Sequence, residues 1–175
     1  MRTSSFLGVC LAILAGSAWA EPLGLGHAPD EALVRAWDID VSADGAGLPG
    51  GRGSVAEGAG VYARKCASCH GAHGEGNPMD QLVGGQGTLA GAQPIKTIGS
   101  FWPFATTVFD YIRRAMPFDA PQSLSDDEVY AVTAYLLYRN GIVGETAVMD
   151  AHTLPSVSMP NRSGFVPDPR PDADR

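Results

Sequence analysis

Two cysteines and the histidine that follows them are the residues in this chain best suited to do chemistry. They stand at Cys66, Cys69 and His70, with two residues between the thiols. Thiols at this spacing can add to the two vinyl groups of one haem edge, and the next residue then places an imidazole nitrogen over the iron. A zinc site would need four ligands, and the other histidines have no paired spacing. A thioredoxin-like redox pair would need a βαβ context and no adjoining histidine. The motif therefore predicts one covalently attached haem c.

An iron that transfers electrons without binding a gas needs a second axial ligand. We expect Met116 to supply it, because this residue lies between two predicted helices and directly before the rigid Pro117. Such a position can hold a thioether against the open haem face, and a Met/His pair raises the reduction potential. Met159 is the second choice, and core packing is the ordinary role of any methionine. The other candidates are Met79, Met149, His27, His73 and His152.

Further residues could support a haem around this motif. Trp102 and Arg113 could donate hydrogen bonds to the propionates, and the guanidinium could offset their charge. The alternative roles are a core position for Trp102 and a solvated position for Arg113. A carbonyl at Pro78, or at Pro94 instead, could accept from Nδ1 of His70 and fix the orientation of the ring.

The helix that delivers the motif is predicted over residues 55–65. Ser54 begins it, and Glu57 three residues later completes a capping box. Gly58 and Tyr62 lie four apart on one face, where a small residue beside an aromatic one permits close approach of another helix. The chain after the motif is glycine-rich from 71 to 91, and a loop of that length suggests that it wraps a cofactor.

Two more helices follow the glycine-rich loop. The first spans residues 105–115, with Thr106 or Thr107 as its cap, and Pro117 stops it. The second begins at the N-cap Ser125, with Glu128 as its capping-box partner. It ends with Arg139 in its last turn and Gly141 as the C-terminal stop, and its apolar side holds Val129, Val132, Tyr135, Leu136 and Leu137.

Residues 1–20 read as a signal peptide that is cleaved after Ala20. A positive Arg2 precedes the apolar run 6–15, and Ala18 and Ala20 form an A-x-A cleavage signal. The run is too short to cross a bilayer, and no later segment offers a transmembrane anchor. A lipoprotein interpretation of Cys10 is weaker, because this cysteine lies inside the apolar run. We therefore expect a soluble periplasmic protein.

The segments that flank the central region carry little periodic pattern. Residues 21–53 form an N-terminal extended segment in which Trp37, Ile39 and Val41 alternate with acids, as in a strand or a strip on the domain surface. Residues 145–175 form a C-terminal tail. The formal net charge of −7 argues against nucleic acid and anionic membranes as partners.

The region 54–144 resembles the class I cytochromes c. The resemblance rests on Gly58 and Tyr62, on the run from Cys66 to His70, on Met116 with its proline, and on the aromatic last helix. It implies an all-α fold whose helices wrap around one covalently bound haem, with extended N- and C-terminal segments.

A narrower resemblance is to the cytochrome subunits of sulfur and sulfite dehydrogenases of the Sox type. It is carried by residues 37–41, 101–117, 121–137 and 159–165. In that family a molybdenum-cofactor subunit oxidises sulfite or a protein-bound sulfane sulfur. The haem subunit takes the electrons singly and passes them to a soluble cytochrome c. The resemblance implies an electron-relay subunit that is not catalytic by itself. Some members have two haem domains, whereas this chain has one motif.

Two other functions remain open at the level of the sequence. A free-standing periplasmic electron shuttle would need no stable partner. A haem-based ligand binder would leave the sixth position of the iron open. No nucleophile and base can be paired in the chain, so any enzymatic activity would belong to a complex.

Overall fold

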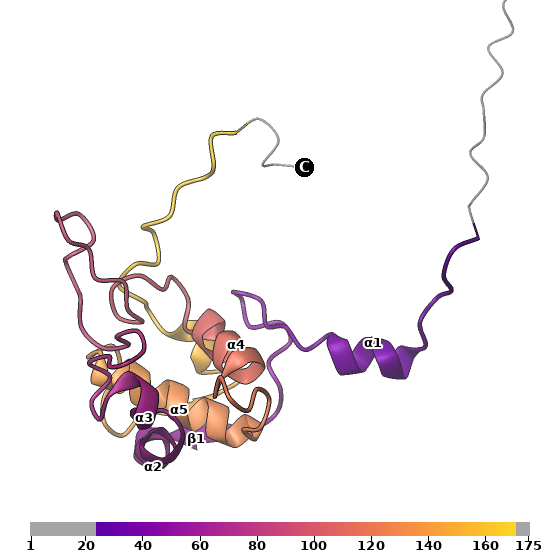
Figure 1. Ribbon diagram of the computed structural model, residues 1–175, viewed down its shortest axis with the longest axis horizontal. Coiled ribbons are helices and arrows are strands. Elements are labelled where there is room, and N and C mark those ends of the chain that lie inside the picture. Colours follow the sequence, from indigo (N-terminus) through magenta and orange to yellow (C-terminus); the bar gives the residue numbers. More distant parts are fainter. Residues whose placement is uncertain (1–23, 171–175) are drawn as a thin grey trace, which may run out of the picture. The chain divides into compact units, whose positions relative to one another are not determined.

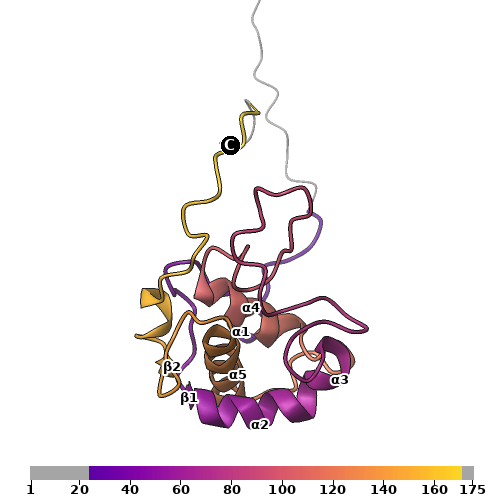
Figure 2. The same cartoon turned by 90° about the vertical axis from the view of Figure 1, so that its left-hand side faces the viewer.

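The computed structural model describes residues 24–170, and the predicted signal peptide and the final residues of the tail lie outside them. The described elements are α1 (Glu31–Trp37), β1 (Arg52–Ser54), α2 (Val55–Lys65), α3 (Ala67–His70), α4 (Ala105–Ala115), α5 (Asp126–Arg139), β2 (Val148–Asp150) and a 3-10 turn, η1 (Leu154–Ser156). Figures 1 and 2 show α2, α4 and α5 in two orthogonal views. No helix within residues 24–170 is long and apolar enough to cross a membrane.

The close contact of α2 with α5 is the centre of the fold. Ser54 and Glu57 form the predicted capping box at the start of α2. A Cβ placed on Gly58 would overlap the backbone carbonyl of Ala131 on α5, so only glycine permits this approach. One turn later, the rings of Tyr62 and Tyr135 pack with their centroids 5.2 Å apart. The predicted small-residue and aromatic face of α2 is therefore confirmed.

Both ends of α5 follow the predicted signals. The Oγ of Ser125 accepts from the backbone N–H of Glu128, whose carboxylate in turn accepts from the N–H of Ser125. After the C-cap, Gly141 takes φ +68°. The N–H of Ile142 then donates to the carbonyl of Leu137 at 3.0 Å, which closes a Schellman motif. Local sequence thus determines the length of the most buried helix.

The start of α4 differs from the prediction. Its N-cap is Phe104, and no side chain makes a capping hydrogen bond there. Thr106, expected as a possible cap with Thr107, is instead fully buried, and its Oγ1 donates to the carbonyl of Ala43 at 3.0 Å. The hydroxyl of Thr106 therefore bonds to a distant segment of the chain and does not cap its own helix. The local sequence around Thr106 cannot reveal this partner. The end of α4 at Ala115, just before Met116 and Pro117, is as predicted.

The alternating pattern at Trp37 does not form a strand. Trp37 is the last residue of α1 and is 81% exposed, whereas Val41 is buried in the core. The helix is broken after Trp37, and the chain then lies against the domain. The interpretation as a surface strip therefore holds from about residue 39 onward, and the strand interpretation is wrong.

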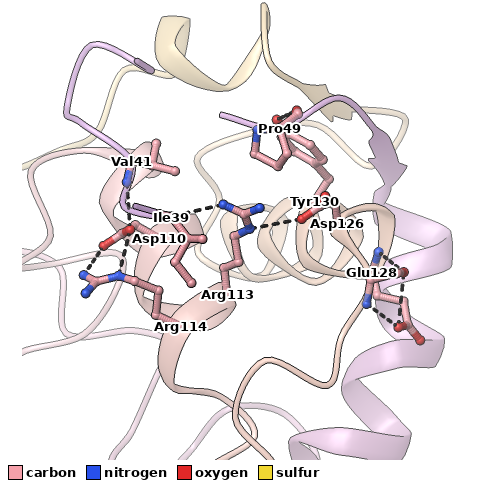
Figure 3. Close-up of polar contacts among 10 residues, drawn as sticks. Ile39, Val41, Pro49, Asp110, Arg113, Arg114, Asp126, Glu128 and Tyr130 are labelled. Atoms are coloured by element: carbon pink, nitrogen blue, oxygen red, sulfur yellow. Dashed lines mark hydrogen bonds and ion pairs between the residues drawn. The ribbon is translucent and has the colours of Figure 1, made fainter. Parts of the chain in front are cut away.

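Side chains of α4 and α5 hold this N-terminal strap, residues 39–52, by its backbone (Figure 3). Arg113 donates to the carbonyl of Ile39 at 3.0 Å, and Asp110 accepts from the N–H of Val41 at 2.9 Å. Further along, the hydroxyl of Tyr130 donates to the carbonyl of Pro49 at 2.8 Å. The turns of this irregular segment satisfy only some of its backbone polar groups, and the helices supply partners for others.

The tail beyond residue 144 also contributes to the core. β2 pairs antiparallel with β1, with Gly53 opposite Met149. Met149, Leu154 and Met159 are all at most 5% exposed and belong to the main apolar cluster. The helical part of the fold agrees with the all-α prediction, and the small two-stranded ribbon was not predicted. The boundaries placed at 54 and 144 stay a prediction, although residues outside them supply buried side chains.

Candidate haem site

The attachment motif occupies the turn that joins α2 to the four-residue helix α3. Cys66 is both the C-cap of α2 and the N-cap of α3, and its carbonyl accepts from the N–H groups of Cys69 and His70 at 3.1 and 3.0 Å. In such a helical turn, residues three apart lie on one side. Both thiols are free, with Cys66 half-buried and Cys69 exposed. The turn thus presents two thiols together, as attachment to one haem edge requires.

Burial raises the pKa of the Cys66 thiol to about 11, and the neighbouring Cys69 adds to the effect. A dithiol redox centre needs the opposite shift, since a lowered pKa of the attacking thiol favours the reactive thiolate. Cys66 instead behaves as an apolar group packed against the core. The electrostatics therefore argue against a thioredoxin-like pair and favour an apolar cofactor edge.

The imidazole of His70 is oriented by a backbone carbonyl. Its Nδ1 lies 2.7 Å from the carbonyl oxygen of Asp80. Because a carbonyl can only accept, Nδ1 carries the proton and Nε2 keeps a free lone pair for a metal. The sequence placed this acceptor at Pro78 or Pro94, and that prediction is wrong. Hydrogen bonds within the loop, including the one from the N–H of Met79 to the carbonyl of Cys69 at 2.9 Å, turn the chain so that the Asp80 carbonyl reaches Nδ1.

A clamp on the segment after His70 comes from α2 and α5. The hydroxyl of Tyr62 donates to the carbonyl of Gly71 at 2.8 Å, and burial raises the pKa of this phenol to about 12. On α5, Arg139 donates to the hydroxyl of Tyr135 at 2.9 Å and lies 3.5 Å from Nδ1 of His73. The two helices therefore hold the first turn of the loop that carries the His70 acceptor.

Asn140, which sequence reasoning missed, holds the rest of this loop. Its Nδ2 donates to the carbonyl of Leu82 at 3.1 Å, and its Oδ1 accepts from the N–H of Gly84 at 3.0 Å. Its own carbonyl accepts from the side chain of Gln86 at 3.0 Å. The sequence signals only a helix end, since Asn before Gly141 is common C-terminal chemistry. The reach of the side chain to a loop more than 50 residues away depends on the fold.

Met116 is the C-cap of α4, with its N–H bonded to the carbonyl of Ile112 at 3.0 Å. Its side chain is half-buried and packs against the same apolar cluster as Cys66. Met149 and Met159 lie inside that cluster, at 5% and 2% exposure. The other candidates, namely Met79, His27, His73 and His152, are exposed. Among the candidates, Met116 thus combines partial exposure with a place at the edge of the core.

Trp102 and Arg113, the two residues expected to contact the haem propionates, interact with other groups of the protein in this structure. Arg113 donates to the carboxylate of Asp126 at 3.0 Å, in addition to the strap carbonyl. Trp102 is half-buried and packs edge-to-face on Tyr111, with ring centroids 5.6 Å apart. Their roles toward a haem stay a prediction.

The donor set as a whole fits a covalently bound haem c. It comprises two free thiols on one turn, an imidazole with a fixed tautomer, and a thioether at the edge of the core. The apolar surroundings of Cys66 suit a porphyrin edge better than a hydrated metal ion. When bound, the haem would supply one-electron redox chemistry, which the protein's own side chains do not provide.

Comparisons with known proteins agree with this chemistry. Residues 53–136 match the family described as cytochrome c oxidase, cbb3-type, subunit III. The chain is also similar to a chain in the crystal structure of the sulfane dehydrogenase SoxCD from Paracoccus pantotrophus. That match has 45% identity and a TM-score of 0.80, and it covers 87% of this chain and 76% of the other. A search of curated proteins found no match. The protein thus belongs to the c-type cytochromes of the Sox type.

Proposed function

We propose that this protein is the periplasmic mono-haem subunit of a molybdenum-dependent sulfur or sulfite dehydrogenase. It accepts single electrons from the catalytic subunit and passes them to a soluble cytochrome c. The observation that carries the proposal is the 45% identity to a chain of the sulfane dehydrogenase SoxCD over 87% of this chain. The donor set around His70 supports the same conclusion, because a one-electron carrier fits between a two-electron oxidation and a single-electron acceptor.

Each residue has a separate task in this proposal. Cys66 and Cys69 would hold the haem through thioether bonds, and His70 would bind the iron through Nε2. The Asp80 carbonyl raises the basicity of the imidazole through the Nδ1 hydrogen bond, and this bond lowers the cost of holding the oxidised iron. Met116 would be the second iron ligand, and a thioether there would favour the reduced iron and raise the reduction potential.

The first experiment tests whether the protein accepts the electrons. Holoprotein from the periplasm is mixed anaerobically with the purified molybdenum-containing subunit of the same organism and either sulfite or a sulfane-sulfur donor. Reduction of one haem per chain, measured by absorbance, is the expected result. Haem that stays oxidised with both donors, while dithionite reduces it, would contradict the proposal.

A second experiment identifies the axial ligand. Met116→Ala should abolish the near-infrared sulfur-to-iron band of the oxidised protein and lower the reduction potential. Met79→Ala is the matched control, because that methionine is 54% exposed and its loss should leave both readouts unchanged. If the band survives in Met116→Ala, the ligand assignment is wrong. Carbon monoxide binding to the unsubstituted reduced protein would instead indicate an open site and a ligand-binding function.

A further inference from the structure

The short helix α1 exposes three apolar side chains on one side. Leu33, Val34 and Trp37 are 50%, 44% and 81% exposed, and their spacing places them together on the helix surface. None of the seven residues of α1 is buried. Isolated helices shorter than about 12–15 residues are only marginally stable in water. Taken by itself, α1 therefore has no core that would stabilise it, and its three apolar side chains lie on its own surface.

The strap that follows α1 is firmly attached. Only Asp38 separates the helix from Ile39, whose carbonyl is bonded to Arg113 at 3.0 Å. Val41 and Ala43 are held next, by Asp110 and Thr106. Any protein that binds α1 is thereby tethered to the haem domain by one free residue. Such a short tether keeps the bound partner at high effective concentration around the domain.

Charge favours a different protein over a second copy as this partner. Residues 30–44 contain five acids and one arginine, a net charge of −4, within a chain of net charge −7. Two such segments would repel each other, whereas an apolar groove with a basic rim is complementary to them. Tryptophan is also enriched among the residues that dominate binding energies, and an amphipathic helix in a groove is a recurring mode of recognition.

We infer that α1 is a docking arm that inserts Leu33, Val34 and Trp37 into an apolar groove with a basic rim on the dehydrogenase's catalytic subunit. This inference rests on the proposed function for the identity of the partner. The arm supplies affinity, and the haem domain supplies the redox centre. Because acidic residues flank the apolar face, the association should weaken as the salt concentration rises.

The test uses the full-length holoprotein and the purified molybdenum-containing subunit of the same organism. Binding is measured by calorimetry for the unsubstituted protein, for Trp37→Ser and for Val166→Ser. Val166 is the matched control, since it is an apolar residue of the other flank that is 85% exposed. Trp37→Ser should weaken binding at least tenfold and Val166→Ser less than twofold, with identical haem spectra. Amide exchange of residues 31–37 should also slow in the complex.

The outcomes separate this inference from the proposed function. Equal affinities for Trp37→Ser and Val166→Ser, with normal binding and haem reduction of the unsubstituted protein, would overturn the arm and leave the proposed function standing. An unsubstituted protein that neither binds nor is reduced would overturn both. A dimer of the cytochrome alone that dissociates in Trp37→Ser would show that a second copy occupies the arm, and it would also overturn the inference.

Discussion

The closeness of α2 to α5 can be tested with two glycines of the same helix. Replacing a helical glycine by alanine stabilises a helix by about 1 kcal/mol. At Gly58 the new Cβ would overlap the carbonyl of Ala131 and lie 2.8 Å from the Cβ of Tyr135. Overpacking costs about 1–3 kcal/mol, and we expect the upper part of this range, about 2–3 kcal/mol, because a helix backbone cannot move aside as a flexible side chain does. We therefore expect Gly58→Ala to destabilise the protein by about 1–2 kcal/mol.

Gly60 is the internal control for this prediction. The nearest atom to a Cβ there is the guanidinium end of Arg64 at 3.2 Å, which can rotate away. Gly60→Ala should therefore keep the helix-propensity gain and stabilise the protein by about 0.5–1 kcal/mol. The two variants should differ by about 1.5–3 kcal/mol, with opposite signs relative to the parent protein.

The assay is urea unfolding of the holoprotein, followed both by helical circular dichroism and by haem absorbance. Each variant should keep the slope of the transition and shift only its midpoint, because the fold stays the same. Equal stabilisation by both substitutions would refute the close crossing of α2 and α5. A change of slope in Gly58→Ala alone would show that the variant adopts a different packing, and its midpoint would then not measure the overlap.

Three further predictions concern single contacts. Ser125→Ala should cost about 1 kcal/mol by removing the N-cap of α5, measured as a urea midpoint against Ser125→Gly, which should lose only a few tenths. The N–H groups of Thr153 and of the residue before it lower the pKa of Asp150, so the stability this carboxylate contributes is present above about pH 4 and is lost as the pH falls further. Asp150→Asn should therefore flatten the acid side of a stability–pH profile, and an unchanged profile would refute this. Tyr130→Phe should lower stability by about 0.5–1.5 kcal/mol through loss of the bond to Pro49, and no shift in the midpoint would show that this bond is not made in solution.

Local signals in the sequence predicted the local structure well. Ser54 and Ser125 each begin a helix whose third residue completes a capping box, and Gly141 ends α5. Each of these features depends on residues within one or two turns, so a pattern can reveal it. The attachment motif is of the same kind, because all its residues lie within five positions.

Most of the features that the sequence did not predict depend on contacts beyond one or two helical turns. Threonine is a common N-cap residue, but the hydroxyl of Thr106 donates a hydrogen bond to a carbonyl 63 residues away. The acceptor for His70 was expected at Pro78 or Pro94 and lies at Asp80, because hydrogen bonds within the loop set the path of the chain between the thiols and residue 80. Met159, the second choice of iron ligand, lies in the core, and the tail around it has no periodic pattern from which this burial could be predicted.

The ribbon of β1 and β2 has a mechanical consequence. The strap leads into β1, which is hydrogen-bonded to β2, and the N–H of Arg52 is also held by Asp127 at 2.8 Å. A pull on the N-terminal flank, such as a moving partner would exert, therefore loads these bonds before it reaches α2 and the thiols beyond it. The ribbon and the Arg52–Asp127 bond would therefore bear the tension first, and the geometry around His70 would change little.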